Sequence, residues 1–253
     1  MTGDEYILSI LSKYEVPRGP ESAAEQAARR IAPKIQRWAG GWLASLSHSG
    51  SYAKRTAVHG TTDMDIFISL KPEMPGTLEK IYNELFTLAA LHGWNPRRRE
   101  VSIGITLNGL NLDLIPGRGQ AGYENLHDLY WLKSDSLRQT DVNLHVATVA
   151  KSHRLGEIQA IKIWRHIHQL AWPSLYLDLF VINALAGRNT DSLAHNILHV
   201  LDLMGETLET TGIVDPANPD NVLSDDVTAE EKKSIADQAK KSAAAQHWED
   251  IIW

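Results

Sequence analysis

The segment ITLNGLNLDLIPG, residues 105–117, constrains the fold more than any other part of the sequence. Its Asn108-Gly109 pair stands between two alternating apolar runs, and this dipeptide favours the tight turn that joins two antiparallel strands. The sequence therefore predicts a β-hairpin. Its second strand carries Asp113, a lone acid among apolar neighbours, beside the strand that ends at Leu107.

Apolar spacing divides the chain into a mixed first part and a helical second part. The expected strands are 43–46, 64–70 and 97–107 in addition to the hairpin, and the expected helices are 5–15, a Pro33-containing pattern after Pro20, 77–94, 142–170, 174–187, 192–209 and 228–245. Residues 211–226, rich in Pro, Asn and Asp, are expected to form a loop. We therefore expect an α+β protein with a mixed sheet within residues 1–140 and a mainly helical region over residues 141–253.

The composition excludes several functional classes. The 253 residues are 43% hydrophobic and 22% charged, which is typical of a globular chain. No apolar run reaches the length of about 18 residues that a membrane span needs, and the acidic start MTGDEYILSI is unlike a signal peptide, so we expect a soluble cytoplasmic protein. Cysteine is absent, so any metal must be held mainly by Asp, Glu or His. The net charge of −6 argues against a protein whose main task is to coat nucleic acid.

Two aspartates stand at the head of the apolar strand MDIFISL. Asp63 and Asp65 are two residues apart, so both carboxylates lie on the same face of a strand. Their repulsion is offset if they share divalent cations, and Mg²⁺ is typically held by carboxylates and substrate phosphates. Asp113 is the candidate third ligand if the hairpin lies beside this strand. Taken singly, each aspartate is more simply explained as a strand-end charge or a turn cap.

A Gly-Ser pair precedes the two aspartates. Gly50 allows close approach of the backbone, and Ser51 opens a predicted short helix whose free N–H groups and hydroxyl suit a phosphate. Lys54 and Arg55 add positive charge nearby. Such a pair alone usually marks a turn, and only its spacing to Asp63 makes it informative.

Together, Gly50-Ser51, the Asp63-Met64-Asp65 strand and the later Asp113 resemble the signature of the DNA polymerase β-type nucleotidyltransferase superfamily. The segment GSYAKRT, residues 50–56, is similar to the version of this motif in the template-independent branch of the superfamily. That branch includes bacterial cyclic-oligonucleotide synthases, cyclic GMP-AMP synthase, oligoadenylate synthetases and archaeal-type CCA-adding enzymes. The resemblance implies a polymerase β-like catalytic core with N-terminal helices over residues 1–140, packed against a helical nucleotide-binding domain over residues 141–253. It also implies that the three aspartates are catalytic and hold two Mg²⁺ ions, with Mn²⁺ as an alternative.

Three later stretches extend the resemblance: IKIW at 161–164, PSLYLDL at 173–179 and DPANPDN at 215–221. They imply that Lys162 contacts the triphosphate of a bound nucleotide and that Ser174 and Tyr176 lie near the phosphates and base. Local alternatives remain for each stretch, namely a solvated lysine, a helix cap and a turn. The candidate nucleotide-binding residues are Gly50, Ser51, Lys54, Lys162, Ser174 and Tyr176.

The resemblance leaves the acceptor of the nucleotide open. One hypothesis is the synthesis of a cyclic or linear oligonucleotide second messenger of the antiviral-defence kind from ATP or another nucleoside triphosphate, with release of pyrophosphate. The alternative is addition to an RNA 3′ end, as in CCA-adding or terminal nucleotidyltransferases. In that case the basic residues Arg97–Arg99, Lys151 and Arg154 would contact the RNA backbone. Transfer to a protein or small drug, and a catalytically inactive scaffold, are further alternatives. The sequence shows neither a zinc insertion nor a tRNA-binding domain, and it decides neither the base preference, the linkage, the activator nor the oligomeric state.

Overall fold

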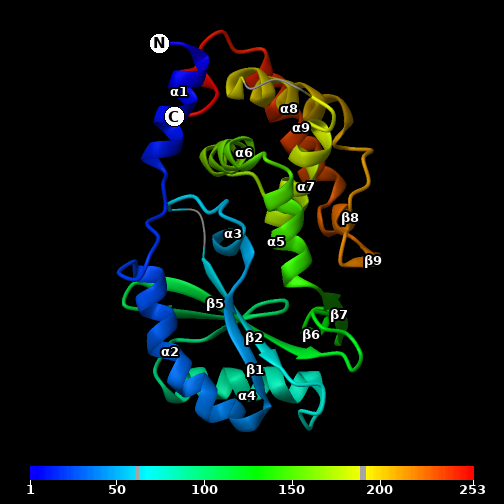
Figure 1. The fold of residues 1–253 in the computed structure, drawn as a ribbon. Coiled ribbons are helices and arrows are strands. Elements are labelled where there is room, and N and C mark those ends of the chain that lie inside the picture. The colour runs from blue at the N-terminus through cyan, green and yellow to red at the C-terminus, as the bar shows by residue number, and fades with distance from the viewer. Residues whose placement is uncertain (61–62, 189–191) are drawn as a thin grey trace. The chain divides into compact units, whose positions relative to one another are not determined.

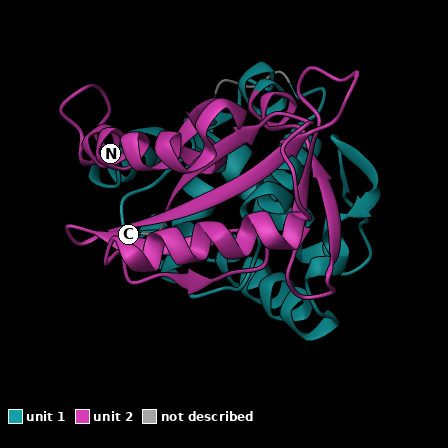
Figure 2. Cartoon of the chain, turned by 90° about the horizontal axis from the view of Figure 1, so that it is seen from below, with its two compact units in different colours: residues 1–16, 54–62, 147–253 teal, residues 17–53, 63–146 magenta. Residues whose placement is uncertain are grey.

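The computed structural model describes residues 1–60, 63–188 and 192–253. The chain forms two compact units, each assembled from separate stretches of sequence (Figure 2). The sheet unit comprises residues 17–53 and 63–146, and the helical unit comprises residues 1–16, 54–62 and 147–253.

The sheet unit is built on a mixed sheet, which confirms the α+β class that the sequence predicts. The strands of this sheet are β1 (Leu43–His48), β2 (Met64–Leu70), β3 (Arg97–Arg98), β4 (Ile103–Leu107), β5 (Leu110–Gly119), β6 (His127–Trp131) and β7 (Ser136–Thr140). They run in the order β1-β2-β5-β4-β3, and β6 pairs with both β5 and β7. Strands β2 and β5 are parallel, whereas the other pairs are antiparallel.

Helices α2 (Ala23–Ala39) and α4 (Leu78–Leu91) cover one face of this sheet (Figure 1). Each begins at a side-chain cap, because the hydroxyls of Ser22 and Thr77 accept hydrogen bonds from backbone N–H groups in the first turn. Pro33 lies within α2 and does not end it. The apolar stripes of the two helices are buried with the strand residues that alternate toward them, among them Ile66, Ile68, Leu112 and Leu114.

The hairpin and the strand before it show where turn chemistry decides the fold. Asn108 and Gly109 have φ values of 51° and 80°, so the β4–β5 hairpin forms as predicted. The single strand expected over 97–107 is wrong, because a turn closed by the Arg99 N–H and the Ser102 carbonyl (3.0 Å) separates β3 from β4. Strands β6 and β7 were not expected, since their sequences HDLYW and SLRQT show little apolar alternation.

The helical unit holds most of the predicted helices. Its elements are α1 (Gly3–Lys13), the end of α5 (Val142–Lys151), α6 (Leu155–Ile167), α7 (Ser174–Ala184), α8 (Leu193–Thr207) and α9 (Ala229–Ala243). These helices share one apolar core that includes Trp164, Tyr176 and Met204. The single helix expected over 142–170 is wrong, because the chain breaks after α5, where His153 has a φ of 56°. Among the described helices, none combines the length and apolarity needed to span a membrane.

The Asp215 segment folds as a small hairpin where the sequence predicted only a loop. Strands β8 (Val214–Asp215) and β9 (Asn218–Val222) pair antiparallel. The Asp215 carboxylate accepts hydrogen bonds from the Ala217 N–H (2.8 Å) and from Asn221 Nδ2 (3.0 Å). Asp215 and Asn221 therefore stabilise this turn, as the local alternative for the DPANPDN stretch proposes.

Candidate active site

The carboxylates of the candidate site come from two adjacent parallel strands. Asp65 on β2 and Asp113 on β5 are register partners, so their side chains project side by side from one face of the sheet. Asp63 immediately precedes β2, and its carboxylate pairs with the same guanidinium, that of Arg99, as the Asp113 carboxylate does. The hairpin therefore lies beside the 64–70 strand, which was the condition for the three aspartates to gather. We call Asp63, Asp65 and Asp113 the carboxylate site.

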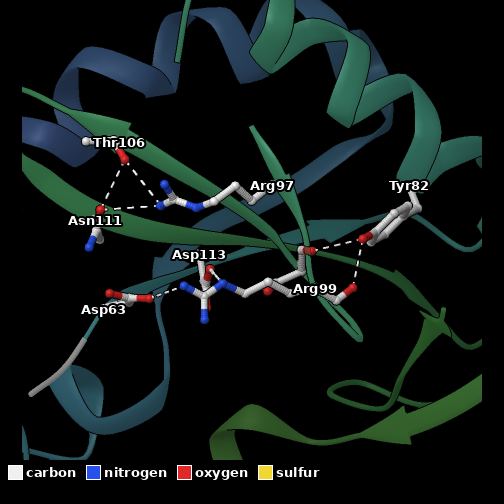
Figure 3. A network of polar contacts seen from close by, with 8 residues as sticks. Asp63, Tyr82, Arg97, Arg99, Thr106, Asn111 and Asp113 are labelled. Carbon is white, nitrogen blue, oxygen red and sulfur yellow. Dashed lines mark hydrogen bonds and ion pairs between the residues drawn. The ribbon is translucent and has the colours of Figure 1, made fainter. Parts of the chain in front are cut away.

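A cation from the chain itself already lies in this site. The Arg99 guanidinium forms ion pairs with Asp63 through Nη2 and with Asp113 through Nε, the latter at 3.0 Å (Figure 3). Within residues 1–60, 63–188 and 192–253 no group of three or more His, Cys, Asp or Glu side chains has the arrangement of a ready metal site. The donors are nevertheless hard carboxylate oxygens, the ligands that Mg²⁺ and Mn²⁺ prefer, and a cation is already held between two of them. The chemistry of these donors therefore suits a divalent ion.

Burial and charge act against each other at Asp113. Burial raises the pKa of its carboxyl group, the Arg99 guanidinium opposes this, and the Asp63 carboxylate raises the pKa further, with a net upward shift. An additional cation at Asp113 would favour the charged carboxylate for the same electrostatic reason as Arg99 does.

Gly50 and Ser51 begin the short helix α3 (Gly50–Ala53), as predicted. Gly50 has a φ of 55°, and a Cβ at this position would collide with the Asp65 carboxylate. Glycine is therefore required both for its backbone conformation and for the close approach of Asp65. The Ser51 side chain is buried, and its hydroxyl has no hydrogen-bond partner among the described residues. A buried unpaired hydroxyl is costly, so a ligand oxygen at Ser51 would remove this cost.

The helical unit contains a second charged group, the lysine cluster, formed by Lys54, Lys162 and Asp178. Lys54 Nζ lies 2.5 Å from Asp178 Oδ2, and Lys162 Nζ lies 2.7 Å from Asp178 Oδ1. Lys162 also donates a hydrogen bond to Thr56 Oγ1 (2.7 Å). Lys162 is 1% exposed, so the alternative that it is a solvated helix residue is wrong.

The charges of the lysine cluster do not cancel, because two ammonium groups share one carboxylate. Burial lowers the pKa of Lys162 to about 8, Asp178 opposes this, and Lys54 adds to the lowering. Burial acts to raise the pKa of Asp178, but the two lysines outweigh it and hold that pKa below its ordinary value. The cluster therefore carries an excess positive charge near neutral pH, which suits an anionic ligand.

Ser174 and Tyr176 both lie at the start of α7. Ser174 is the first helical residue, with Pro173 at the cap position, and its hydroxyl accepts a hydrogen bond from Arg165 Nη1 at 3.2 Å. The alternative that Ser174 is an N-cap is therefore wrong. The Tyr176 ring is fully buried and packs edge-on against Trp172 with ring centroids 5.5 Å apart. Burial raises the pKa of the Tyr176 hydroxyl to about 12. Stacking of a base on this ring requires a rearrangement of the core around it.

Sequence reasoning did not assign two residues to these groups, Asp178 and Arg99. Asp178 had a visible signal, because it is the lone charge in the apolar helix SLYLDLFVINA. Arg99 had none, since it is one of three consecutive arginines whose sequence context does not separate them.

No protein-family profile and no curated protein sequence matches this chain. Solved structures match its fold over nearly its whole length. The structure of CdnC from E. coli MS115-1 with ATP has a TM-score of 0.76 and 17% identity, covering 98% of this chain and 96% of that chain. The Elizabethkingia meningoseptica CdnE cyclic dinucleotide synthase with GTP and Apcpp has a TM-score of 0.73 and 10% identity, covering 97% and 100%. A mutant Cid1 poly(U) polymerase bound to MgATP has a TM-score of 0.69 and 11% identity, covering 95% and 93%.

These similarities confirm the fold that the motifs predict. The chain shares its fold with structures described as a cyclic dinucleotide synthase and a poly(U) polymerase. Sequence identities of 10–17% support a similarity of fold only. The chemistry therefore has to be argued from this chain's own residues.

Proposed function

We propose that this protein is a metal-dependent nucleotidyltransferase that joins nucleoside triphosphates into a cyclic or linear oligonucleotide and releases pyrophosphate. The observation that carries the proposal is the in-register pair Asp65 and Asp113 on adjacent parallel strands, with Asp63 beside them and Gly50 packed against Asp65. Three acids on one sheet face repel one another unless cations bind among them. A nucleotide bound with divalent cations is the ligand that this arrangement fits best.

The roles of the residues follow from their chemistry. Asp63, Asp65 and Asp113 would hold the divalent cations, which when bound supply charge stabilisation for the attacking and leaving oxygens of an in-line displacement. The Ser51 hydroxyl, which lacks a partner among the described residues, would donate to a phosphate oxygen. Asp113 is the candidate acceptor for the proton of the attacking hydroxyl, as the family resemblance implies. Lys54, Lys162, Ser174 and Tyr176 remain predicted nucleotide contacts.

The acceptor hydroxyl is proposed to belong to a second nucleotide. The match to a structure described as a cyclic dinucleotide synthase supports this choice, and the match to CdnC with ATP supports ATP as a substrate. The net charge of −6 also favours a small acceptor over a long polyanion. Addition to an RNA 3′ end is the second candidate, because a poly(U) polymerase shares the fold as well.

One experiment separates these candidates. The purified protein is incubated with Mg²⁺ or Mn²⁺ and labelled ATP, GTP, CTP or UTP, with and without RNA, and pyrophosphate and phosphatase-resistant products are measured. We expect pyrophosphate and small resistant products without RNA. Label on RNA alone would favour the second candidate, and no pyrophosphate with any nucleotide would overturn both. Asp128→Asn is the matched control for the aspartate variants, because Asp128 lies on the same sheet but pairs with Gln120.

A further inference from the structure

Arg99 bridges two carboxylates that are far apart in the sequence. Its Nη2 pairs with Asp63 Oδ2, and its Nε lies 3.0 Å from Asp113 Oδ1 (Figure 3). The Arg99 side chain is 44% exposed, so these pairs form at the surface of the sheet unit and can exchange with solvent ions.

The backbone around this guanidinium leaves room for it. Gly104 on β4 is the register partner of Asp113, and a Cβ at residue 104 would lie 2.9 Å from Arg99 Nε and 3.2 Å from Asp113 Oδ1. Any side chain at residue 104 would therefore press on the guanidinium. Glycine at this position creates the space that the Arg99 side chain fills.

The main chain of Arg99 is held by hydrogen bonds, whereas its side chain is partly exposed. Its N–H donates to the Ser102 carbonyl at 3.0 Å, and its carbonyl accepts a hydrogen bond from the buried Tyr82 hydroxyl at 2.8 Å. The fixed backbone therefore directs the guanidinium toward the two carboxylates. Because the side chain is partly exposed, it can adopt another conformation without disturbing the backbone.

The two neighbouring arginines have other partners. Arg97 donates hydrogen bonds to Thr106 and Asn111, and Arg98 donates to Asn83 and stacks over Phe86 at 4.3 Å. Only Arg99 of these three residues pairs with the carboxylate site. The contact therefore does not follow simply from the local density of positive charge.

We propose that Arg99 is a positioning residue for the carboxylate site, which holds Asp63 and Asp113 together when no metal is bound and which the first divalent cation must displace. The inference rests on the proposed function, because it assigns a metal to these aspartates. A guanidinium and a divalent cation cannot share this space, since they would repel each other while competing for the same carboxylates. Arg99 thereby sets the cation concentration at which the site fills.

The test measures metal binding without nucleotide, by calorimetric titration of the full chain with Mn²⁺. Arg99→Gln should bind Mn²⁺ about tenfold more tightly than the wild type, because two partly exposed ion pairs no longer compete with the metal. Arg97→Gln is the matched control, since it removes the same charge from the adjoining strand β3 without touching an ion pair of the site. Equal or weaker binding by Arg99→Gln, an equal gain in Arg97→Gln, or no Mn²⁺ binding by any variant would overturn the proposal.

A second variant displaces Arg99 without changing any charge. Gly104→Ala places a Cβ closer to Arg99 Nε (2.9 Å) than to Asp113 Oδ1 (3.2 Å), so it should move the flexible Arg99 side chain first and also tighten Mn²⁺ binding if it folds with an unchanged circular dichroism spectrum. Arg99→Gln should in addition lower the melting temperature in EDTA, and added Mn²⁺ should remove that difference. A difference that persists in Mn²⁺ would mark Arg99 as a structural residue and overturn the proposal.

These results are distinguishable from failure of the proposed function. If Arg99→Gln binds Mn²⁺ more tightly but the protein releases no pyrophosphate from any nucleotide, only the proposed function is contradicted. If Arg99→Gln still releases pyrophosphate and its Mn²⁺ affinity is unchanged, only the inference that Arg99 competes with the metal is contradicted.

Discussion

The carboxylate site and the lysine cluster use the same arrangement with opposite signs and different burial. In each, one counter-charge bridges two like charges: Arg99 between Asp63 and Asp113, and Asp178 between Lys54 and Lys162. The side chains of the first trio are 44%, 27% and 13% exposed, whereas those of Asp178, Lys54 and Lys162 are 0%, 5% and 1% exposed.

This difference in burial predicts different roles. A partly exposed ion pair contributes little to stability and exchanges readily with dissolved ions, whereas breaking a buried pair leaves an uncompensated charge in the interior. We therefore expect substitutions in the carboxylate site to change activity and metal binding, and substitutions in the lysine cluster to change folding.

The largest expected effect is on turnover. Asp65→Asn should reduce the rate of pyrophosphate release on the order of a thousandfold, because it removes an anionic ligand at the point where charge develops in the reaction. Circular dichroism and thermal melting should remain close to those of the wild type. Turnover comparable to that of the Asp128→Asn control would remove Asp65 from the catalytic site.

The next effect is on stability. Asp178→Asn should lower the free energy of unfolding by about 3–5 kcal/mol, since it leaves two buried ammonium groups without a carboxylate. Urea denaturation measures this change. Asp237→Asn breaks the exposed i,i+4 pair with Lys233 and serves as the control, with no measurable change expected. Similar stabilities of the two variants would contradict the contrast between buried and exposed ion pairs.

A smaller effect is expected from pH. The pKa of Lys162 is lowered to about 8 in the folded protein from an ordinary value of 10.5, so the unfolded chain binds more protons between these pH values. Lys162 should therefore make the free energy of unfolding rise with pH across this window, by at most about 1.4 kcal/mol per pH unit. The slope for the wild type minus that for Lys162→Met isolates this contribution. A difference that is zero or negative would show that Lys162 is not desolvated in this way.

The smallest expected effect on stability concerns Gly50. Gly50→Ala should cost about 1–2 kcal/mol, because alanine is disfavoured at a φ of 55° and its Cβ meets the Asp65 carboxylate. The same displacement of Asp65 should weaken Mn²⁺ binding. Gly60→Ala is a suitable control, since Gly60 also has a positive φ of 78° but a Cβ there would meet no atom of the described residues within 4 Å. Equal Mn²⁺ affinities in the two variants would show that residue 50 does not influence the carboxylate site.

Much of the local structure was predictable because short-range chemistry decides it. The Asn108-Gly109 turn, the 64–70 strand and the capped helices α4 and α9 follow from φ preferences, alternation and N-terminal hydroxyls. The errors fall where those signals are weak. Strands β6 and β7 have little apolar alternation, and the break at His153 interrupts a helical pattern without a proline or glycine.

The sequence by itself determined which residue types head each strand and the turns between them, and through motif spacing it indicated the nucleotidyltransferase fold. Only the tertiary structure decided that β5 pairs with β2 in the register that sets Asp113 beside Asp65, that Arg99 and neither Arg97 nor Arg98 meets the acids, and that Lys162 is buried against Asp178. The physical reason is the distance along the sequence between the residues that interact. Turns and helix caps depend on neighbours a few residues away, whereas strand pairing, burial and the partners of a charge depend on which distant segments share a core.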